Sequence, residues 1–402
     1  MPRRRQAVTR RHPCRSIRPI PVRKDASMTA NPSLLHRIAF ASMRGLTPAL
    51  AREILARIGS EEQFFTLTAD QISSVLGFRN RLFDRSLRDK ALAEADRETQ
   101  FIGRNNIRAT YFTDPGYPTH LLECDDAPLM LYSVGQCDLN AARIVSVVGT
   151  RHATSYGTAF VDDLVEGLAE KCADPVIIVS GLAYGIDVAA HRAALRAGLP
   201  TVGVLAHGLN TIYPAAHRDI AARMAKSGGM LITDYRSSDN IHKGNFLARN
   251  RIIAGLSDCL VVVESDTRGG ALVTARLASA YSRDVFALPG RISDRYSRGC
   301  NSLISSCVAS LITSPGDLID AMRWPRRPSE GDQSALFPEG SDDGISDEEQ
   351  AIIDIITTRG DATIGELTAS VDIPTPRLMG MLIDMEFRAL ISAVPGGRYR
   401  IR

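Results

Sequence analysis

Five short segments of this chain carry residues that suit an anionic ligand. Each combines glycine with arginine or small polar residues, directly after an apolar run or directly before a helical pattern. Bare backbone N–H groups at a helix start bind phosphate, and an arginine guanidinium can donate two parallel hydrogen bonds to it. The segments are VVGTRHATSYG, SGLAYGIDVAAHRAAL, AHGLNTIYPAAHR, GNFLARNRII and SDTRGGALVTAR.

The candidate binding residues all lie in these five segments. Their aromatic side chains can stack on nucleic-acid bases, with about 1–3 kcal/mol for each stacked base. Taken singly, a glycine also suits a tight strand-to-helix turn and an aromatic ring more often belongs to the core, so the prediction depends on the recurrence. The candidates are Gly149, Thr150, Arg151, Tyr156, Gly157, Ser180, Gly181, Tyr184, Tyr213, His217, Arg218, Asn245, Phe246, Arg249, Asn250, Gly269 and Gly270.

Two arginines of the fourth segment cannot both face one ligand from a regular helix. Arg249 and Arg251 are two residues apart, which separates them by about 200° around a helix axis. We expect Arg251 to form an internal ion pair and Arg249 to reach outward.

The chain lacks the sequence signatures of catalysis. It has no GxGxxG or P-loop, no nucleophile elbow and no HExxH. Asp187 and His191 are four residues apart on one helical face, but a helix cap with a hydrogen-bonded histidine explains them better than a metal or acid–base site. The seven cysteines are scattered without any CxxC and are expected to be reduced. We therefore expect no enzyme activity, no cofactor and no metal.

Composition indicates a cytoplasmic protein of two or three domains. The chain has 402 residues, 44% of them hydrophobic, and no apolar run long enough to span a membrane. Its net charge of +3 is misleading, because residues 1–24 hold nine arginines and lysines and no acid, which leaves about −6 on the remainder. Nucleic-acid binding must therefore depend on a local basic patch.

The elements that must position the five segments alternate between strands and helices. Apolar runs such as ARIVSVVG, PVIIVSG, TVGVLA, MLITDY, DCLVVVES and DVFALPG are separated by helical patterns. This alternation predicts a doubly wound, mostly parallel α/β domain over residues 101–325. In such a domain the ligand lies beyond the carboxyl ends of the strands.

The flanking regions have different patterns. Residues 1–32 form a disordered basic tail, either a nucleic-acid arm or an extension before a translation start at Met28. Residues 33–100 form a helical domain, similar to sterile-alpha-motif or helix-hairpin-helix modules. An acidic linker over 326–345 precedes a winged helix over 346–402. The third helix of that domain has only Arg377 and Arg388 against nearby acids, which favours a protein contact over groove reading.

Taken in order, these motifs resemble the DprA/Smf family of DNA-processing proteins. The resemblance covers nearly half the chain and includes GGALVTA, FALPG and RGCNSLI besides the segments above. It implies a Rossmann-like core that binds single-stranded DNA, forms a homodimer through the same domain, protects the strand and loads RecA during natural transformation.

The resemblance also implies roles for particular residues. Arg151 would be the strongest phosphate contact, with Gly149, Ser180, Gly181 and Asn250 in the pocket. His217 or Arg218 would be the basic residue after the Tyr-Pro pair. The chain departs from the family at Ala215, Ala216 and Tyr184, where polar or basic residues are common, so this wall is expected to be less basic.

Two other kinds of function remain open. One is a nucleotide hydrolase of the lysine-decarboxylase-like type on the same fold, although TRGGALVTA lacks the acid expected beside its glycines. The other is an interaction scaffold built on the two flanking modules, which predicts that residues 100–325 alone bind no DNA.

Overall fold

The structure, a computed structural model, forms two compact units. It describes residues 32–328, 346–371, 373–388, 390–394 and 397–401, and the units divide at Arg327 and Pro328. The predicted basic tail and acidic linker lie almost entirely outside the described residues. No described helix combines the length and the apolar character that crossing a bilayer requires.

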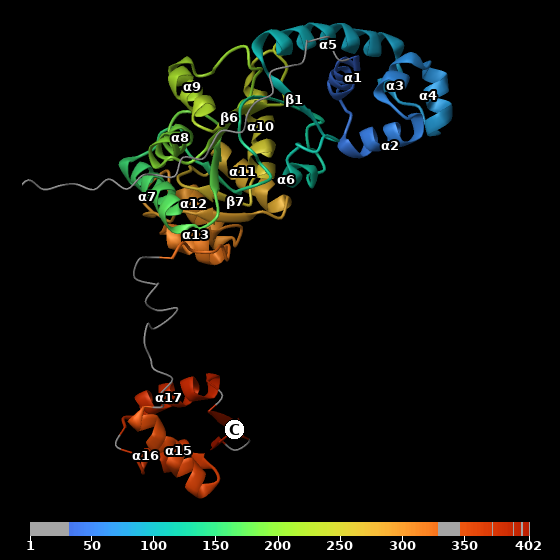
Figure 1. Ribbon diagram of the computed structural model, residues 1–402. Helices are drawn as coiled ribbons and strands as arrows, with labels where there is room; N and C mark the ends of the chain where they lie inside the picture. The colour runs from blue at the N-terminus through green and yellow to red at the C-terminus, as the bar shows by residue number, and fades with distance from the viewer. Residues whose placement is uncertain (1–31, 329–345, 372, 389, 395–396, 402) are drawn as a thin grey trace, which may run out of the picture. The chain divides into compact units, whose positions relative to one another are not determined.

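The first unit begins with a group of helices around an aromatic core (Figure 1). Phe64 packs edge-on against Phe40, Phe65 and Phe83, and the buried Arg88 donates to the carbonyls of Phe64 and Phe83. The assignment of this region to the sterile-alpha-motif or helix-hairpin-helix class stays a prediction. The helices are α1 (Pro32–Ala41), α2 (Pro48–Ile58), α3 (Glu61–Thr66), α4 (Ala69–Leu76), the 3-10 turn η1 (Arg81–Phe83) and α5 (Arg85–Asn105).

The centre of the unit is a nine-stranded sheet with the order β1-β2-β6-β5-β4-β3-β7-β8-β9. The seven strands from β3 onward pair in parallel, which confirms the predicted mostly parallel α/β sheet. The strands are β1 (Arg108–Tyr111), β2 (Met130–Gly135), β3 (Arg143–Val148), β4 (Val176–Ser180), β5 (Thr201–Val204), β6 (Met230–Thr233), β7 (Cys259–Val262), β8 (Asp284–Ala287) and β9 (Ser310–Leu311).

The segment ahead of the parallel strands extends the sheet. β1 and β2 pair antiparallel with each other, and β2 continues the sheet antiparallel to β6. The short runs ATYF and LMLY carry little strand signal alone. They become strands because the edge of β6 offers unpaired backbone groups.

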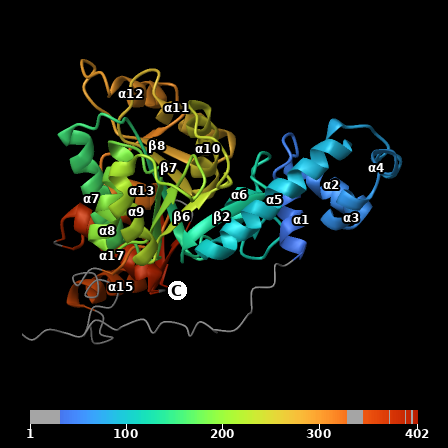
Figure 2. The same ribbon diagram turned by 90° about the horizontal axis from the view of Figure 1, so that it is seen from above.

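Helices cover both faces of the sheet (Figures 1 and 2). Side chains of α10, α11, α12 and the N-terminal helices form an apolar core with one face of the sheet. Side chains of α7, α8 and α13 form a second core with the opposite face. The helices are α6 (Thr119–Leu122), α7 (Ser155–Lys171), α8 (Ile186–Ala197), α9 (Arg218–Lys226) with the turn η2 (Ala215–His217) before it, α10 (Lys243–Leu256), α11 (Gly270–Ala280), α12 (Arg298–Ser305) and α13 (Pro315–Ala321).

Strand order creates a crevice beside β3. The chain proceeds from β3 through β4, β5 and β6 in one direction, then returns to place β7 on the other side of β3. The segments that follow β3 and β7 therefore diverge at the carboxyl edge of the sheet. This is the topological switch point, where doubly wound sheets bind their ligands.

The second unit is small and has its own apolar core, which includes Ile352, Leu367, Leu378 and Leu382. Thr363 caps α16 through a capping box with Glu366. Arg377 pairs with Glu348 and Arg388 with Glu349, at 2.8 and 2.7 Å. Its elements are α15 (Asp347–Arg359), β10 (Ala362–Thr363), α16 (Ile364–Thr368), α17 (Thr375–Phe387), β11 (Ile391–Val394) and β12 (Arg398–Ile401), with the sheet order β10-β12-β11.

Candidate functional site

A pocket of about 250 Å³ lies at the switch point. We call it the switch-point pocket. It is bounded by the segments after β3 and β7 and by the first turns of α10 and α11. Eight of the seventeen predicted residues line it, which are Gly149, Thr150, Arg151, Phe246, Arg249, Asn250, Gly269 and Gly270.

Arg151 is the cation that this pocket presents to solvent. Its side chain is exposed and forms no ion pair with any other described residue. The guanidinium carbon lies 5.7 Å from the centre of the Phe246 ring, and that ring meets Tyr213 edge-on at 5.6 Å. Tyr213 itself is 51% exposed. The three side chains form a continuous surface of one positive charge and two rings.

The segment that carries Arg151 is fixed by the segment after β4. Gly185 has a φ of +77°, and a Cβ there would lie 2.2 Å from the Thr150 carbonyl oxygen. Only glycine allows that approach, which lets the Ile186 N–H donate to the Thr150 oxygen at 3.1 Å. The Thr150 N–H donates to the Glu264 carbonyl at 2.7 Å. Arg151 therefore projects from a backbone held on two sides.

The start of α7 does not offer the free N–H groups that were predicted for it. The Glu264 carboxylate accepts hydrogen bonds from the Thr154 N–H at 2.9 Å and from its hydroxyl at 2.6 Å. Thr154 in turn accepts from the Gly157 N–H, and Gly157 packs so closely on Glu264 that a Cβ would clash. The expectation of a phosphate at this helix start is wrong because a buried carboxylate of the protein occupies the position.

The start of α8 is closed in a similar way. Asp187, in its first turn, accepts a hydrogen bond from the Ala183 N–H at 3.4 Å. Burial raises the pKa of this carboxyl, opposed by the nearby Arg249.

The start of α11, unlike the starts of α7 and α8, is open to a ligand. Gly269 and Gly270 begin this helix without a side-chain cap, and its first turn contains no acid. Asn250 lies across the pocket from them. It is 9% exposed, and its side-chain amide makes no hydrogen bond to any described residue. An anion in the pocket would therefore meet a helix start, the guanidinium of Arg151 and an amide able to donate or accept.

The side chains of Arg249 and Arg251 leave α10 in different directions, as predicted. Of their two predicted roles, one is correct and one is wrong. Arg251 pairs with Asp234 at 2.7 Å, as expected. The prediction that Arg249 reaches outward is wrong, since it is only 4% exposed and its guanidinium donates to the carbonyls of Gly181 and Val204. Gly181 directly follows β4 and Val204 is the last residue of β5, so both carbonyls lie at the carboxyl ends of strands, where the buried guanidinium satisfies them.

Several other predicted residues lie outside the switch-point pocket. Tyr156 donates its hydroxyl to the Pro289 carbonyl and lines a neighbouring hollow. Ser180 is buried and donates to the Val147 carbonyl. Asn245 is buried and donates to the Ala206 and Asn240 carbonyls. None of these three side chains lines the switch-point pocket.

The remaining candidates do not line the switch-point pocket. His217 is buried, with its Nδ1 2.8 Å from the Leu182 carbonyl oxygen, and its ring meets the exposed Tyr184 edge-on at 4.9 Å. Arg218 is exposed at the first residue of α9. Gly181 lies directly against the Arg249 guanidinium.

The sequence analysis missed some residues of this site. Leu247, Ser265, Asp266 and Thr274 also line the pocket. Asp266 carries little free charge, because Arg295 pairs with it at 2.6 Å and lowers its pKa. Glu264 and Ser265 directly follow the last residues of the apolar run of β7, and their place at a carboxyl strand end is the signal that could have identified them.

Asp187 and His191 do not form a metal site. The Thr201 hydroxyl donates to the Ile178 carbonyl, so it accepts from Nδ1 of His191 at 2.7 Å, which leaves the proton on that nitrogen. Among the described residues no group of three or more histidine, cysteine or acidic side chains could hold a metal ion. The hydrogen-bonded histidine was predicted correctly.

Fold and pocket together define a Rossmann-like, doubly wound α/β protein with an anion-compatible pocket at its switch point. The family model of DNA recombination-mediator protein A matches residues 108–323. The chain belongs to this family of DNA-processing proteins, which confirms the DprA/Smf resemblance.

The first two of the following relatives support this assignment. Protein Smf of Escherichia coli is 35% identical over 295 residues, which cover 71% of this chain and 75% of that protein. The X-ray structure of DNA processing protein A from Streptococcus pneumoniae is 33% identical with a TM-score of 0.58, covering 71% of this chain and 96% of that one. DNA processing protein A from Helicobacter pylori, described with a unique single-stranded DNA binding mode, is 29% identical with a TM-score of 0.48, covering 54% and 95%.

Proposed function

We propose that this chain binds single-stranded DNA at the switch-point pocket. A family relative, from Helicobacter pylori, has a single-stranded DNA binding mode. The observation that carries the proposal is the unpaired guanidinium of Arg151, which lies over Phe246 and lines the same pocket as the start of α11.

The chemistry of the pocket matches a DNA strand with unstacked bases. A backbone phosphate contacts Arg151 and the N–H group of Gly270, while neighbouring bases stack on Phe246 and Tyr213. Duplex DNA keeps its bases paired and stacked, so it cannot use the rings. Preference for single strands follows from that difference.

A titration with fluorescent oligonucleotides tests this proposal. Arg151→Ala should weaken binding of an oligothymidylate by about tenfold and reduce the salt slope by about 0.7 for one lost phosphate contact. Arg223→Ala is the matched control, because Arg223 is exposed on α9 and lines none of the pockets described here. If Arg151→Ala binds like Arg223→Ala, the proposal fails.

The wider role follows from family membership and goes further than the pocket chemistry. The bound strand would be protected and handed to RecA during recombination and natural transformation, by a homodimer formed through the Rossmann-like domain in the cytoplasm. We infer no reaction at the site. Sedimentation of the full chain tests the dimer, and RecA filament growth on DNA coated with a single-strand-binding protein tests loading.

The flanking regions would serve as interaction modules. We propose that the second unit is a winged helix and that its Arg377 and Arg388, both already ion-paired, make it a poor reader of DNA grooves. The helices before the sheet would form a sterile-alpha-motif or helix-hairpin-helix module. A gel-shift comparison of residues 28–402 with residues 28–328 tests whether the second unit adds to DNA affinity, and we expect no change.

A further inference from the structure

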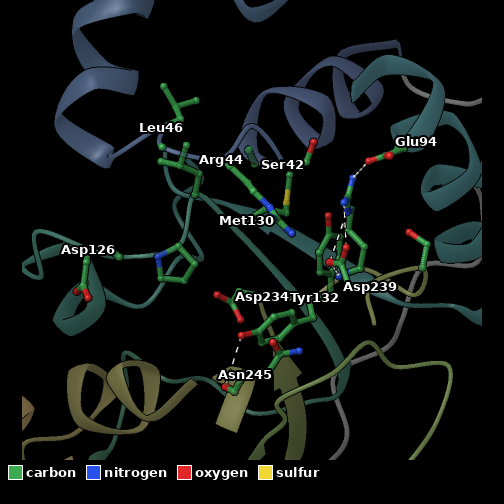
Figure 3. Close-up of a pocket in the computed structure, with 18 of the residues that line it drawn as sticks. Ser42, Arg44, Leu46, Glu94, Asp126, Met130, Tyr132, Asp234, Asp239 and Asn245 are labelled. Carbon is green, nitrogen blue, oxygen red and sulfur yellow. Dashed lines mark hydrogen bonds and ion pairs between the residues drawn. The ribbon is translucent and has the colours of Figure 1, made fainter. Parts of the chain in front are cut away.

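A second and larger hollow lies between the N-terminal helices and the sheet (Figure 3). Its volume is about 810 Å³. Four stretches far apart in sequence line it, which are the α1–α2 loop, α5, the start of β2 and the loop from β6 to α10. We call it the α5 cleft. Its walls include Asn245 and Arg251 of α10, whereas Phe246, Leu247 and Asn250 of the same helix line the switch-point pocket.

Ion pairs fasten the walls of the α5 cleft to each other. Arg236, in the β6–α10 loop, pairs with Glu94 of α5 at 2.7 Å and with Asp239 at 2.9 Å. The buried Glu98 of α5 accepts from both the N–H and the hydroxyl of Ser237. Because α5 and the loop are tied at several points, the cleft is a formed cavity between two fixed walls.

Most charges that line the cleft form ion pairs, while two arginines and one carboxylate form none with described residues. Arg251 pairs with Asp234, whereas Asp126 accepts a hydrogen bond from the neutral Tyr281 hydroxyl at 2.6 Å. Arg44 and Arg97 line the same cavity and make no ion pair or hydrogen bond to any described residue. In Figure 3 the Arg44 side chain extends from the α1–α2 loop into the open space. The cleft therefore carries two spare guanidinium groups.

The floor of the α5 cleft contains a carboxylate and an aromatic ring. Asp234 has one carboxylate oxygen on Arg251, while the other is buried without a donor among the described residues. Tyr132 lines the same space (Figure 3), although only 4% of its surface is exposed. A ligand with an N–H or O–H group and a flat ring would complement this floor, while an anionic group would complement the two arginines above it.

We propose that the α5 cleft is a second phosphate-binding site and that its ligand is a nucleotide. Arg44 and Arg97 hold the phosphate, and the base or sugar faces Asp234 and Tyr132. The nucleotide is either part of a DNA strand or a free nucleoside phosphate. This site goes beyond the proposed function and does not depend on it, since the two pockets share no lining residue that binds phosphate.

The test uses the full chain with two probes. Thymidine monophosphate, followed by calorimetry, represents a free nucleotide, and a fluorescent oligothymidylate represents a strand. The double variant Arg44→Ala, Arg97→Ala is compared with Arg223→Ala. The three arginines are exposed and form no ion pair with described residues, so the fold should be retained.

The expected result is a loss of affinity of about tenfold or more for at least one probe in the double variant only. If the double variant loses affinity for thymidine monophosphate, the ligand is a free nucleotide. If it loses affinity for the oligothymidylate and its salt slope is shallower, the ligand is a DNA strand. If the double variant binds both probes as Arg223→Ala does, or the wild type binds neither, the proposal is overturned. Arg151→Ala, measured in parallel, separates failure of the switch-point proposal from failure of this one.

Discussion

The guanidinium of Arg151 lies over the ring of Phe246, with 5.7 Å between the guanidinium carbon and the ring centre. The two residues are 95 positions apart in the sequence, one after β3 and the other in the first turn of α10. Together they give the switch-point pocket a charge and a stacking surface in direct contact.

Loss of the Phe246 ring should weaken DNA binding without removing charge. Phe246→Leu keeps an apolar side chain but cannot stack on a base, so we expect about tenfold lower affinity for an oligothymidylate, with an unchanged salt slope. Phe246→Tyr retains the ring and should bind like the wild type. Fluorescence anisotropy at several salt concentrations measures both quantities. Equal affinity of the leucine variant would rule out stacking at this position.

Gly185→Ala should destabilise the first unit by at least about 2 kcal/mol, because it adds strain and a clash with the Thr150 carbonyl. Gly198→Ala is the matched control. Gly198 also has a positive φ, but a Cβ added there would meet no atom within 4 Å. Its substitution should therefore lower the free energy of unfolding by only about 1 kcal/mol. Urea unfolding measures the difference. If the two substitutions lower the free energy of unfolding by the same amount, the close approach of Gly185 to Thr150 is not what requires glycine.

Arg249 should prove structural, in contrast with Arg151. Arg249→Leu leaves the carbonyls of Gly181 and Val204 without a donor, so the free energy of unfolding should fall by about 2–4 kcal/mol. Arg151→Ala should leave stability within about 0.5 kcal/mol of the wild type, because its side chain is exposed and unpaired. Thermal and urea unfolding of the two variants check this. A fully stable Arg249→Leu protein would contradict the assignment.

Glu264 should stabilise the start of α7. Glu264→Gln replaces one acceptor oxygen by a donor that faces the donors of Thr154, so we expect a loss of about 1–3 kcal/mol. Glu166→Gln, at an exposed position of the same helix, controls for loss of charge alone. Urea unfolding at neutral pH measures both. Equal stability of the two variants would argue against the cap.

His191 should make the fold sensitive to acid. Burial lowers its pKa from 6.5 to about 3. Between these values the unfolded chain binds a proton that the folded chain does not, so stability falls as the pH falls, by up to about 1.4 kcal/mol per pH unit. His191→Asn keeps a donor for Thr201 and removes the titrating group. Unfolding free energies at pH values on either side of 6.5 should fall less steeply in the variant, and parallel pH curves would disprove the effect.

Much of the fold was predictable from local pattern. The apolar runs that became β3 to β8 are short, continuous and separated by helical periods, which only a sheet covered on both faces accommodates. Tertiary pairing decided β1 and β2, since their strand character comes from the free edge of β6. The α5 cleft was not predictable, because its walls come from four stretches that no local pattern connects.

The sequence by itself determined which residue types gather at the carboxyl edge of the sheet, and that Arg249 and Arg251 must point in different directions. Only the tertiary structure decided which of them is buried, because the Gly181 and Val204 carbonyls meet Arg249 whereas Asp234 meets Arg251. It also decided that the start of α7 is closed by Glu264 and that of α11 is open. Hydrogen-bond satisfaction depends on neighbours in space, and spacing along the chain does not encode them.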